Sequence, residues 1–147
     1  MKSARICLED YFPYFLGVIA NRWTATSSRA YLRKYKIGIG EWRVLASIHS
    51  FGQASSNEVV DQISMDASAV SRSAAKLEDA GHISPVPGKY TGRTKPYALT
   101  ATGIALYAEV RKLALAREDL LLGGLTAAER RSLLELMRKV HRRLDRI

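Results

Sequence analysis

The segment between Ser55 and Gly81 constrains the fold more than any other part of this sequence. Ser55 and Glu58 have the spacing of a capping box, in which each side chain satisfies an unpaired backbone group of the first helical turn. Asp66 is a typical N-cap for a second helix, and Gly81 supplies the left-handed residue that ends it. The pattern therefore predicts a short helix, a tight break and a longer helix over 67–80.

The periodicity changes directly after this helix pair. Residues 82–86 and 97–99 have the composition of two short strands. The stretch 87–96 between them is polar, basic and rich in turn-forming residues. We expect a β-hairpin with a protruding tip.

Helical periodicity appears on both sides of this region. Apolar residues recur at three- and four-residue intervals from Pro13 to Tyr35, and proline is tolerated in a first helical turn. Further helices are predicted over 41–49 and 100–121, and a last one runs from Thr126 to Asp145. The fold class is mainly α with a small β-hairpin wing, a winged helix-turn-helix.

Composition suits one domain, 1–147, with 47% hydrophobic residues and no apolar run long enough to span a bilayer. The single cysteine, Cys7, cannot form an intramolecular disulfide, so a cytoplasmic location is expected. We expect this thiol to be packed and inert, and a peroxide-sensing thiol is the alternative.

Motifs for enzymatic chemistry are missing from the sequence. The three histidines lack metal-ligand spacing, and no phosphate loop, nucleophile elbow or catalytic carboxylate pair is present. We expect no enzymatic activity, no cofactor and no metal.

The formal charge of +9 favours a polyanionic partner, but the excess lies at the two ends of the chain. Residues 54–100 hold five basic and five acidic side chains. The placement of individual basic residues must therefore carry the argument for such a partner.

The helix over 67–80 has the length and position to enter a major groove of DNA. Arg72 can contact a guanine edge or a phosphate, Lys76 can contact a phosphate, and Ser55 can hold another phosphate at its helix N-terminus. A solvated helix face is the alternative interpretation. The candidate residues on the outer face of this helix are Ser68, Ala69, Ser71, Arg72 and Lys76.

The hairpin tip carries Lys89, Arg93 and Lys95 within seven residues. A guanidinium on such a tip can enter a narrow minor groove, where the negative potential is enhanced. A flexible basic loop is the alternative, and the adjacent helix pair favours the DNA contact.

Several motifs together resemble the multiple antibiotic resistance regulator (MarR) family over nearly the whole chain. The resemblance implies that the 67–80 helix reads the major groove and that Arg93 enters the minor groove. It also implies a DNA-binding lobe over 41–100 and a dimerisation lobe of 8–35 and 101–147. The motifs are Glu41–Leu45, Asp66–Arg72, Leu77–Ile83, Gly92–Lys95 and Leu99–Gly103.

The resemblance predicts a ligand-responsive repressor that binds a pseudo-palindromic double-stranded operator as a homodimer. Two other classes stay open: a constitutive architectural DNA-binding protein and a winged-helix protein-interaction module. One position departs from the family, whose wings commonly carry Asp where this chain has Thr91. The hydroxyl can accept a hydrogen bond but lacks the charge that orients the wing arginine.

The Tyr-Phe-Pro-Tyr run that opens the first long helix, followed by Ala20-Asn21-Arg22, is similar to family members that regulate phenolic-acid catabolism. This similarity implies an aromatic acid or an aromatic acyl thioester as effector. Tyr14 and Asn21 would then hydrogen-bond the ligand, and Arg22 or Arg43 would meet a carboxylate. The favoured interpretation of the N-terminal aromatic residues themselves is a dimer core, with the ligand pocket as the alternative, and Arg43 can equally be a structural ion-pair partner.

Overall fold

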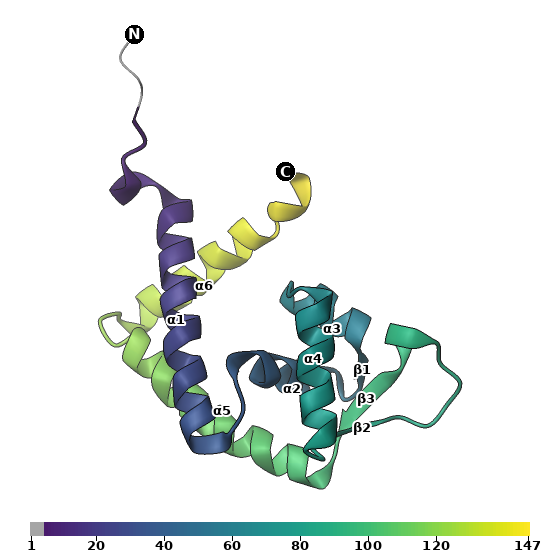
Figure 1. Ribbon diagram of the computed structural model, residues 1–147. Coiled ribbons are helices and arrows are strands. Elements are labelled where there is room, and N and C mark those ends of the chain that lie inside the picture. The colour runs from purple at the N-terminus through teal and green to yellow at the C-terminus, as the bar shows by residue number, and fades with distance from the viewer. Residues whose placement is uncertain (1–4) are drawn as a thin grey trace. The chain divides into compact units, whose positions relative to one another are not determined.

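The computed structural model describes residues 5–147 and confirms a mainly helical chain with a small antiparallel sheet (Figure 1). The chain forms two compact units, one extending to Val110 and the other running from Arg111 to Ile147. No helix within the described residues is both long and apolar enough to cross a membrane.

The first long helix, α1 (Phe12–Tyr35), follows a single 3-10 turn, η1 (Leu8–Asp10), and ends at Lys36 in a left-handed conformation (φ 61°). Helix α2 (Ile39–Phe51) begins earlier than the predicted residue 41. Its first turn forms because the Glu41 carboxylate accepts a hydrogen bond from the backbone N–H of Gly38 at 3.2 Å.

The helix pair forms as the sequence predicts, as α3 (Ser56–Ile63) and α4 (Ala67–Asp79). The Ser55 N–H donates to Glu58 Oε2 at 2.7 Å, and this hydrogen bond lowers the pKa of the Glu58 carboxyl. The Asp66 carboxylate accepts from the Ala69 N–H at 3.0 Å. Gly81 adopts φ 77°, the left-handed stop that was expected.

The wing is built on β2 (Ile83–Pro85) and β3 (Pro96–Leu99), with a 3-10 turn, η2 (Gly92–Thr94), in its tip. A third strand, β1 (Ala54–Ser55), was not predicted because two residues are too short to show a strand period. The strand order is β1-β3-β2, and β1 pairs antiparallel with β3 through Ala54 and Tyr97.

The core of the first unit lies between α2, α3, α4 and the sheet. Val44, Leu45 and Ile48 of α2 are buried against Val70 and Leu77 of α4. These positions recur at three, four and seven residues, so one face of each helix is removed from water. The opposite face of α4 is consequently left to solvent.

Helix α5 (Ala101–Leu121) starts in the first unit and continues into the second, where it is followed by α6 (Ala127–His141). The last helix is shorter than predicted, since it ends at His141 and only a 3-10 turn, η3 (Leu144–Arg146), follows. The predicted capping box of α6 is present, with the Thr126 N–H donating to Glu129 Oε2 at 2.7 Å.

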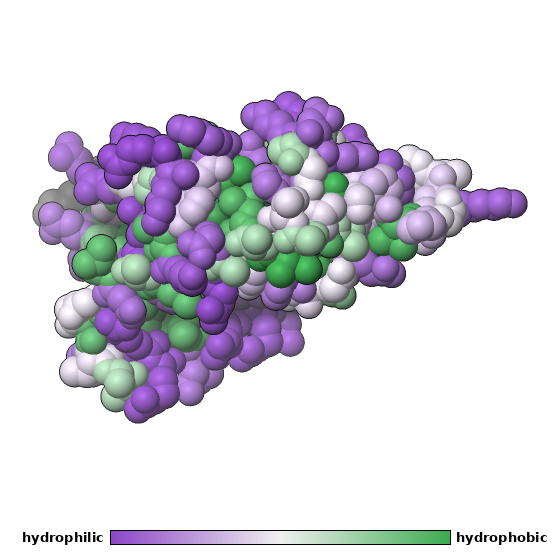
Figure 2. Space-filling view, turned by 90° about the horizontal axis from the view of Figure 1, so that it is seen from below, coloured by the Kyte–Doolittle hydropathy of each residue, from purple (hydrophilic) through white to green (hydrophobic). Residues whose placement is uncertain are grey.

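Large apolar side chains remain exposed on the first half of α1. The buried residues of this helix, Ser27 and Tyr31, lie in its second half. Cys7 was expected to be packed but is exposed. Figure 2, which views the chain from below, shows that hydrophobic side chains also reach the surface among hydrophilic ones on that face. The exposed apolar residues of this segment are Tyr11, Phe12, Tyr14, Phe15, Leu16 and Ile19.

Candidate nucleic-acid interface

The solvent-facing side of α4 carries most of the predicted recognition residues. Ser68 and Arg72 are exposed, one helical turn apart, while Ala69 and Ser71 are half-buried at the edges of this face. Ser73 on the inner side packs against Gly40 of α2, where an added Cβ would lie 2.9 Å from the Ser73 hydroxyl. Ser73 belongs to the buried face of α4, and Arg72 is exposed.

Lys76 is also exposed, and it has a partner within the protein. Its ammonium lies 3.6 Å from Glu41 Oε1, and the Glu41 side chain is only 13% exposed. Glu41 therefore caps the start of α2 and joins α2 to α4. The sequence alone gave no sign of this pair, because its members are 35 positions apart.

Ser55 is 5% exposed, so its hydroxyl is not presented to a ligand. Its Oγ accepts from the Glu58 N–H at 3.3 Å, and its backbone belongs to β1. The structure assigns Ser55 to helix capping, which is the role that the capping-box spacing predicts. The predicted phosphate contact has no exposed hydroxyl here to make it.

The wing presents Lys89 and Arg93 to solvent, and Lys95 is half-buried. The Lys95 ammonium lies 5.2 Å from the centre of the Tyr97 ring, a cation–π contact at the base of the wing. Arg93 is the central residue of the η2 turn at the tip. The three predicted basic residues thus occupy one hairpin, but only two of them extend freely into solvent.

The tip is closed by the side chain of Thr94, which the sequence analysis did not single out. The Thr94 hydroxyl donates to the Thr91 carbonyl oxygen at 2.6 Å and accepts from the Thr91 N–H at 3.3 Å. A backbone bond from the Thr94 N–H to the same carbonyl, at 3.2 Å, completes the turn. The signal available in the sequence was the pair of threonines three residues apart.

Hydrogen bonds connect the candidate recognition helix and the wing. Strand β1, which leads into α3, is paired with the wing strand β3. The hydroxyls of Thr100 and Thr102 donate to the carbonyl oxygen of Gly81 at 2.6 Å and 2.8 Å, which ties the end of α4 to the start of α5. The two candidate DNA-contacting elements therefore form one body (Figure 1).

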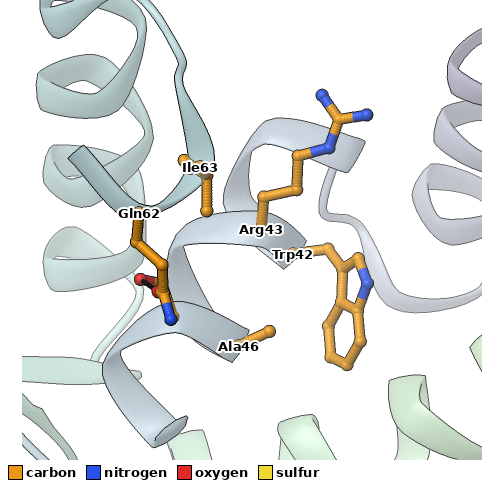
Figure 3. Close-up of a pocket in the computed structure, with 6 residues that line it drawn as sticks. Trp42, Arg43, Ala46, Gln62 and Ile63 are labelled. Atoms are coloured by element: carbon orange, nitrogen blue, oxygen red, sulfur yellow. Dashed lines mark hydrogen bonds between the residues drawn. The ribbon is translucent and has the colours of Figure 1, made fainter. Parts of the chain in front are cut away.

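A pocket of about 360 Å³ lies between α2 and α3. Trp42, Arg43 and Ile63 are among its lining residues, and the buried Ser47 hydroxyl donates to the Gln62 side-chain oxygen inside it. The Arg43 guanidinium donates to the Thr24 hydroxyl at 3.1 Å. Figure 3 shows this guanidinium directed away from Gln62 and also away from the indole of Trp42, which extends in the opposite direction.

Of the four residues predicted to bind an effector, only Arg43 lines this pocket. Tyr14, Asn21 and Arg22 are exposed on α1. Tyr14 packs edge-on against Phe15, with ring centres 5.4 Å apart. The structure of the single chain thus does not bring the four residues together. Within the described residues, no cluster of His, Cys, Asp and Glu could hold a metal ion.

Comparison with known proteins agrees with this architecture. The model of the MarR family matches residues 36–94. A MarR/EmrR family transcriptional regulator from Acinetobacter sp. ADP1 is 30% identical, with a TM-score of 0.88 over 97% of this chain and 100% of its own. This chain therefore belongs to the MarR family of DNA-binding transcriptional regulators.

Two further relatives are informative. The HTH-type transcriptional repressor IacR of Pseudomonas putida is 22% identical over 93% of this chain and 81% of its own length. A mutant of E. coli MarR, solved in complex with operator DNA, shares the fold with a TM-score of 0.72. It is 24% identical over 92% of this chain and 99% of its own. These relatives are transcriptional regulators and not enzymes.

Proposed function

We propose that this protein is a ligand-responsive repressor, located in the cytoplasm, that binds a pseudo-palindromic operator as a homodimer. The observation that carries the proposal is the outward presentation of Arg72 on α4 and Arg93 on the wing of the same hydrogen-bonded body. An arginine in the major groove can read a guanine edge with two hydrogen bonds, and one on a wing can enter the minor groove.

The exposed apolar face of α1 supports the homodimer. Phe12, Phe15, Leu16 and Ile19 lie on one side of the helix and are between 42% and 53% exposed. An isolated chain with this much apolar surface favours association, because burial of the surface removes it from water. A two-fold dimer would place two α4 helices in successive major grooves.

Repression is supported by the relative IacR, which is named a repressor. An α4 helix that occupies an operator can block access of other proteins to the same DNA. Repression by occupancy of the site needs no catalytic group.

The pocket between α2 and α3 supports a response to a ligand. It combines the apolar surfaces of Trp42 and Ile63 with the cationic Arg43. An aromatic acid, or its thioester, has the matching combination of a flat apolar ring and a polar end. A ligand there would contact α3, the helix that precedes α4, and could change the population of chains that bind DNA.

The test is a binding titration with the intergenic DNA beside the protein's own gene, against random competitor DNA, at about 150 mM salt. We expect selective retention and a footprint of two half-sites about one helical turn apart. Replacement of Arg72 by Ala should cost about 1–3 kcal/mol per contact, or about 5-fold to 150-fold in operator affinity. The exposed Arg29 on α1 provides a matched control, and Arg29→Ala should keep wild-type affinity.

Three results would contradict the proposal. Unchanged operator affinity in Arg72→Ala would remove this residue from sequence recognition. Equal weak binding of the wild-type protein to both DNAs would favour an architectural DNA-binding protein, and no binding at this salt concentration would favour a protein-interaction module. Selective binding permits a screen of effectors that begins with aromatic acids.

A further inference from the structure

We infer that Thr94 is the positioning residue for Arg93, and that an uncharged hydroxyl clamp sets the geometry of the wing tip. The inference rests on the proposed operator contact of Arg93. It concerns a different residue, which touches no DNA in this role.

The clamp consists of three hydrogen bonds that close one 3-10 turn around Arg93. Two of them use the Thr94 hydroxyl, which bonds both the N–H and the C=O of Thr91, and the third joins the two backbones. Because the hydroxyl holds both polar groups of Thr91, it restricts rotation on both sides of that residue. Arg93 lies inside the closed turn and shares its orientation.

The wing sequence contains no acidic residue that could orient Arg93 through an ion pair. No acidic residue occurs between Val86 and Lys95. The clamp is therefore neutral, and its strength does not depend on the titration of a carboxylate. Neutral hydrogen bonds are also screened by salt less than an exposed ion pair is.

Two glycines allow the chain to enter this turn. Gly92 adopts φ 53°, a left-handed conformation that glycine reaches without strain. At Gly88, which has φ 153°, an added Cβ would lie 2.6 Å from the ring of Tyr90. The ring of Tyr90 thus lies against the backbone at Gly88 on the approach to the tip, and the clamp holds residues 91–94, which include Arg93.

An ordered tip lowers the entropy that Arg93 loses when it binds, because less conformational freedom remains to be removed. Loss of the clamp should therefore weaken DNA binding without changing the charge of the wing. A loss of affinity at unchanged salt dependence would therefore indicate a positioning role, because the loss of a direct phosphate contact changes the salt dependence of binding.

The experiment compares Thr94→Val, Thr94→Ser, Arg93→Ala and the double variant Arg93→Ala/Thr94→Val in the full-length protein. Valine keeps the branched shape of threonine and removes the hydroxyl, whereas serine keeps the hydroxyl. Operator affinity is measured as a function of salt concentration, and exchange of the Thr91 amide proton is followed by NMR. Unchanged amide signals from β2 and β3 verify that the variants are folded.

Thr94→Val should lower operator affinity about twofold to tenfold, the range of one net hydrogen bond. Its salt dependence should equal that of the wild type, and the Thr91 amide should exchange faster. Thr94→Ser should keep the operator affinity of the wild type and the slow exchange of the Thr91 amide. In the Arg93→Ala background, Thr94→Val should cause no further loss.

Wild-type affinity of Thr94→Val, together with weakened binding by Arg93→Ala, would overturn this inference and leave the proposed function intact. An equal loss from Thr94→Val with and without Arg93 would also overturn it, since the hydroxyl would then act by another route. Wild-type affinity of Arg93→Ala would remove the wing contact from the proposed function, and the positioning role of Thr94 with it.

Discussion

Gly103 lies at the first turn of α5, directly against the backbone of His82. A Cβ at this position would overlap the carbonyl oxygen of His82, a backbone atom that cannot move without shifting the strand that follows it. That carbonyl also accepts the N–H of Thr100 at 3.1 Å. Glycine is therefore required here for close approach and not for an unusual backbone angle.

We predict that Gly103→Ala destabilises the protein by about 1–3 kcal/mol, the usual cost of forcing extra volume into a packed contact. The measurement is the midpoint of thermal or urea unfolding. Gly17 in α1 is a matched control, because an added Cβ there meets nothing within 4 Å. Gly17→Ala should leave stability unchanged or raise it by up to about 1 kcal/mol. An unchanged midpoint in Gly103→Ala would show that the contact relaxes at no cost.

Single residues differ in how well the sequence predicts them. The exposed positions of Arg72 and Arg93 could be predicted, because they follow from helical and hairpin patterns. The role of Glu41 could not, because its ion pair with Lys76 joins two residues 35 positions apart on different helices, and no local period encodes such a pair. Thr94 lay inside the predicted tip, but its hydroxyl could equally have faced water. Such choices depend on tertiary packing.

Among the elements, α3 and α6 both begin with a capping-box glutamate, which couples the stability of the fold to pH. The Ser55 N–H bonds Glu58, and the Thr126 N–H bonds Glu129. These backbone hydrogen bonds, followed by those from the Ser55 and Thr126 side chains, lower the pKa of both carboxyls. A carboxyl with a lowered pKa in the folded state stabilises the fold only while it is ionised.

We predict that part of the stability is lost below about pH 4, where unfolded glutamates take up protons. As pH falls, the unfolded state binds its proton first, and the contribution disappears once the folded pKa is also passed. Glu58→Gln/Glu129→Gln retains an oxygen that can accept the backbone bond but does not titrate. Its unfolding midpoint should therefore fall less than that of the wild type between about pH 6 and pH 3. Parallel curves for the two proteins would contradict the prediction.

The sequence predicts the order of elements well and their limits less well. Helices with a capping box or a glycine stop begin or end close to the expected residue, as α3 and α4 do. Helix α6 ends at His141, although the pattern continues to Asp145. This end could not be predicted, because no strong stop signal lies between the two residues. Strand β1 exists only because β3 is available to pair with it.

At the scale of the whole molecule, the exposed face of α1 predicts self-association. Ile19→Glu places a charge in the middle of this apolar face and should shift a dimer toward monomer. The expected readout is a lower mass in sedimentation at micromolar concentration, with weaker operator binding. Ala25→Glu is the matched control, because Ala25 is exposed on the other side of the helix and should leave the mass unchanged. A dimer that persists in Ile19→Glu would place the interface elsewhere.

The pairing of β1 with β3 has a consequence for the DNA. Within one half-site of the proposed operator, the separation between the major-groove contact proposed for α4 and the minor-groove contact proposed for the wing would be set inside a single chain, where β1 pairs with the wing strand β3. Between half-sites, the separation would be set by how the two chains of the proposed dimer associate. We therefore expect an operator for this protein to obey two independent length rules. Base pairs added within a half-site would move one groove out of reach of either α4 or the wing, because their separation is fixed within the chain. Base pairs added between the half-sites would change only the distance that the two chains of the dimer must span.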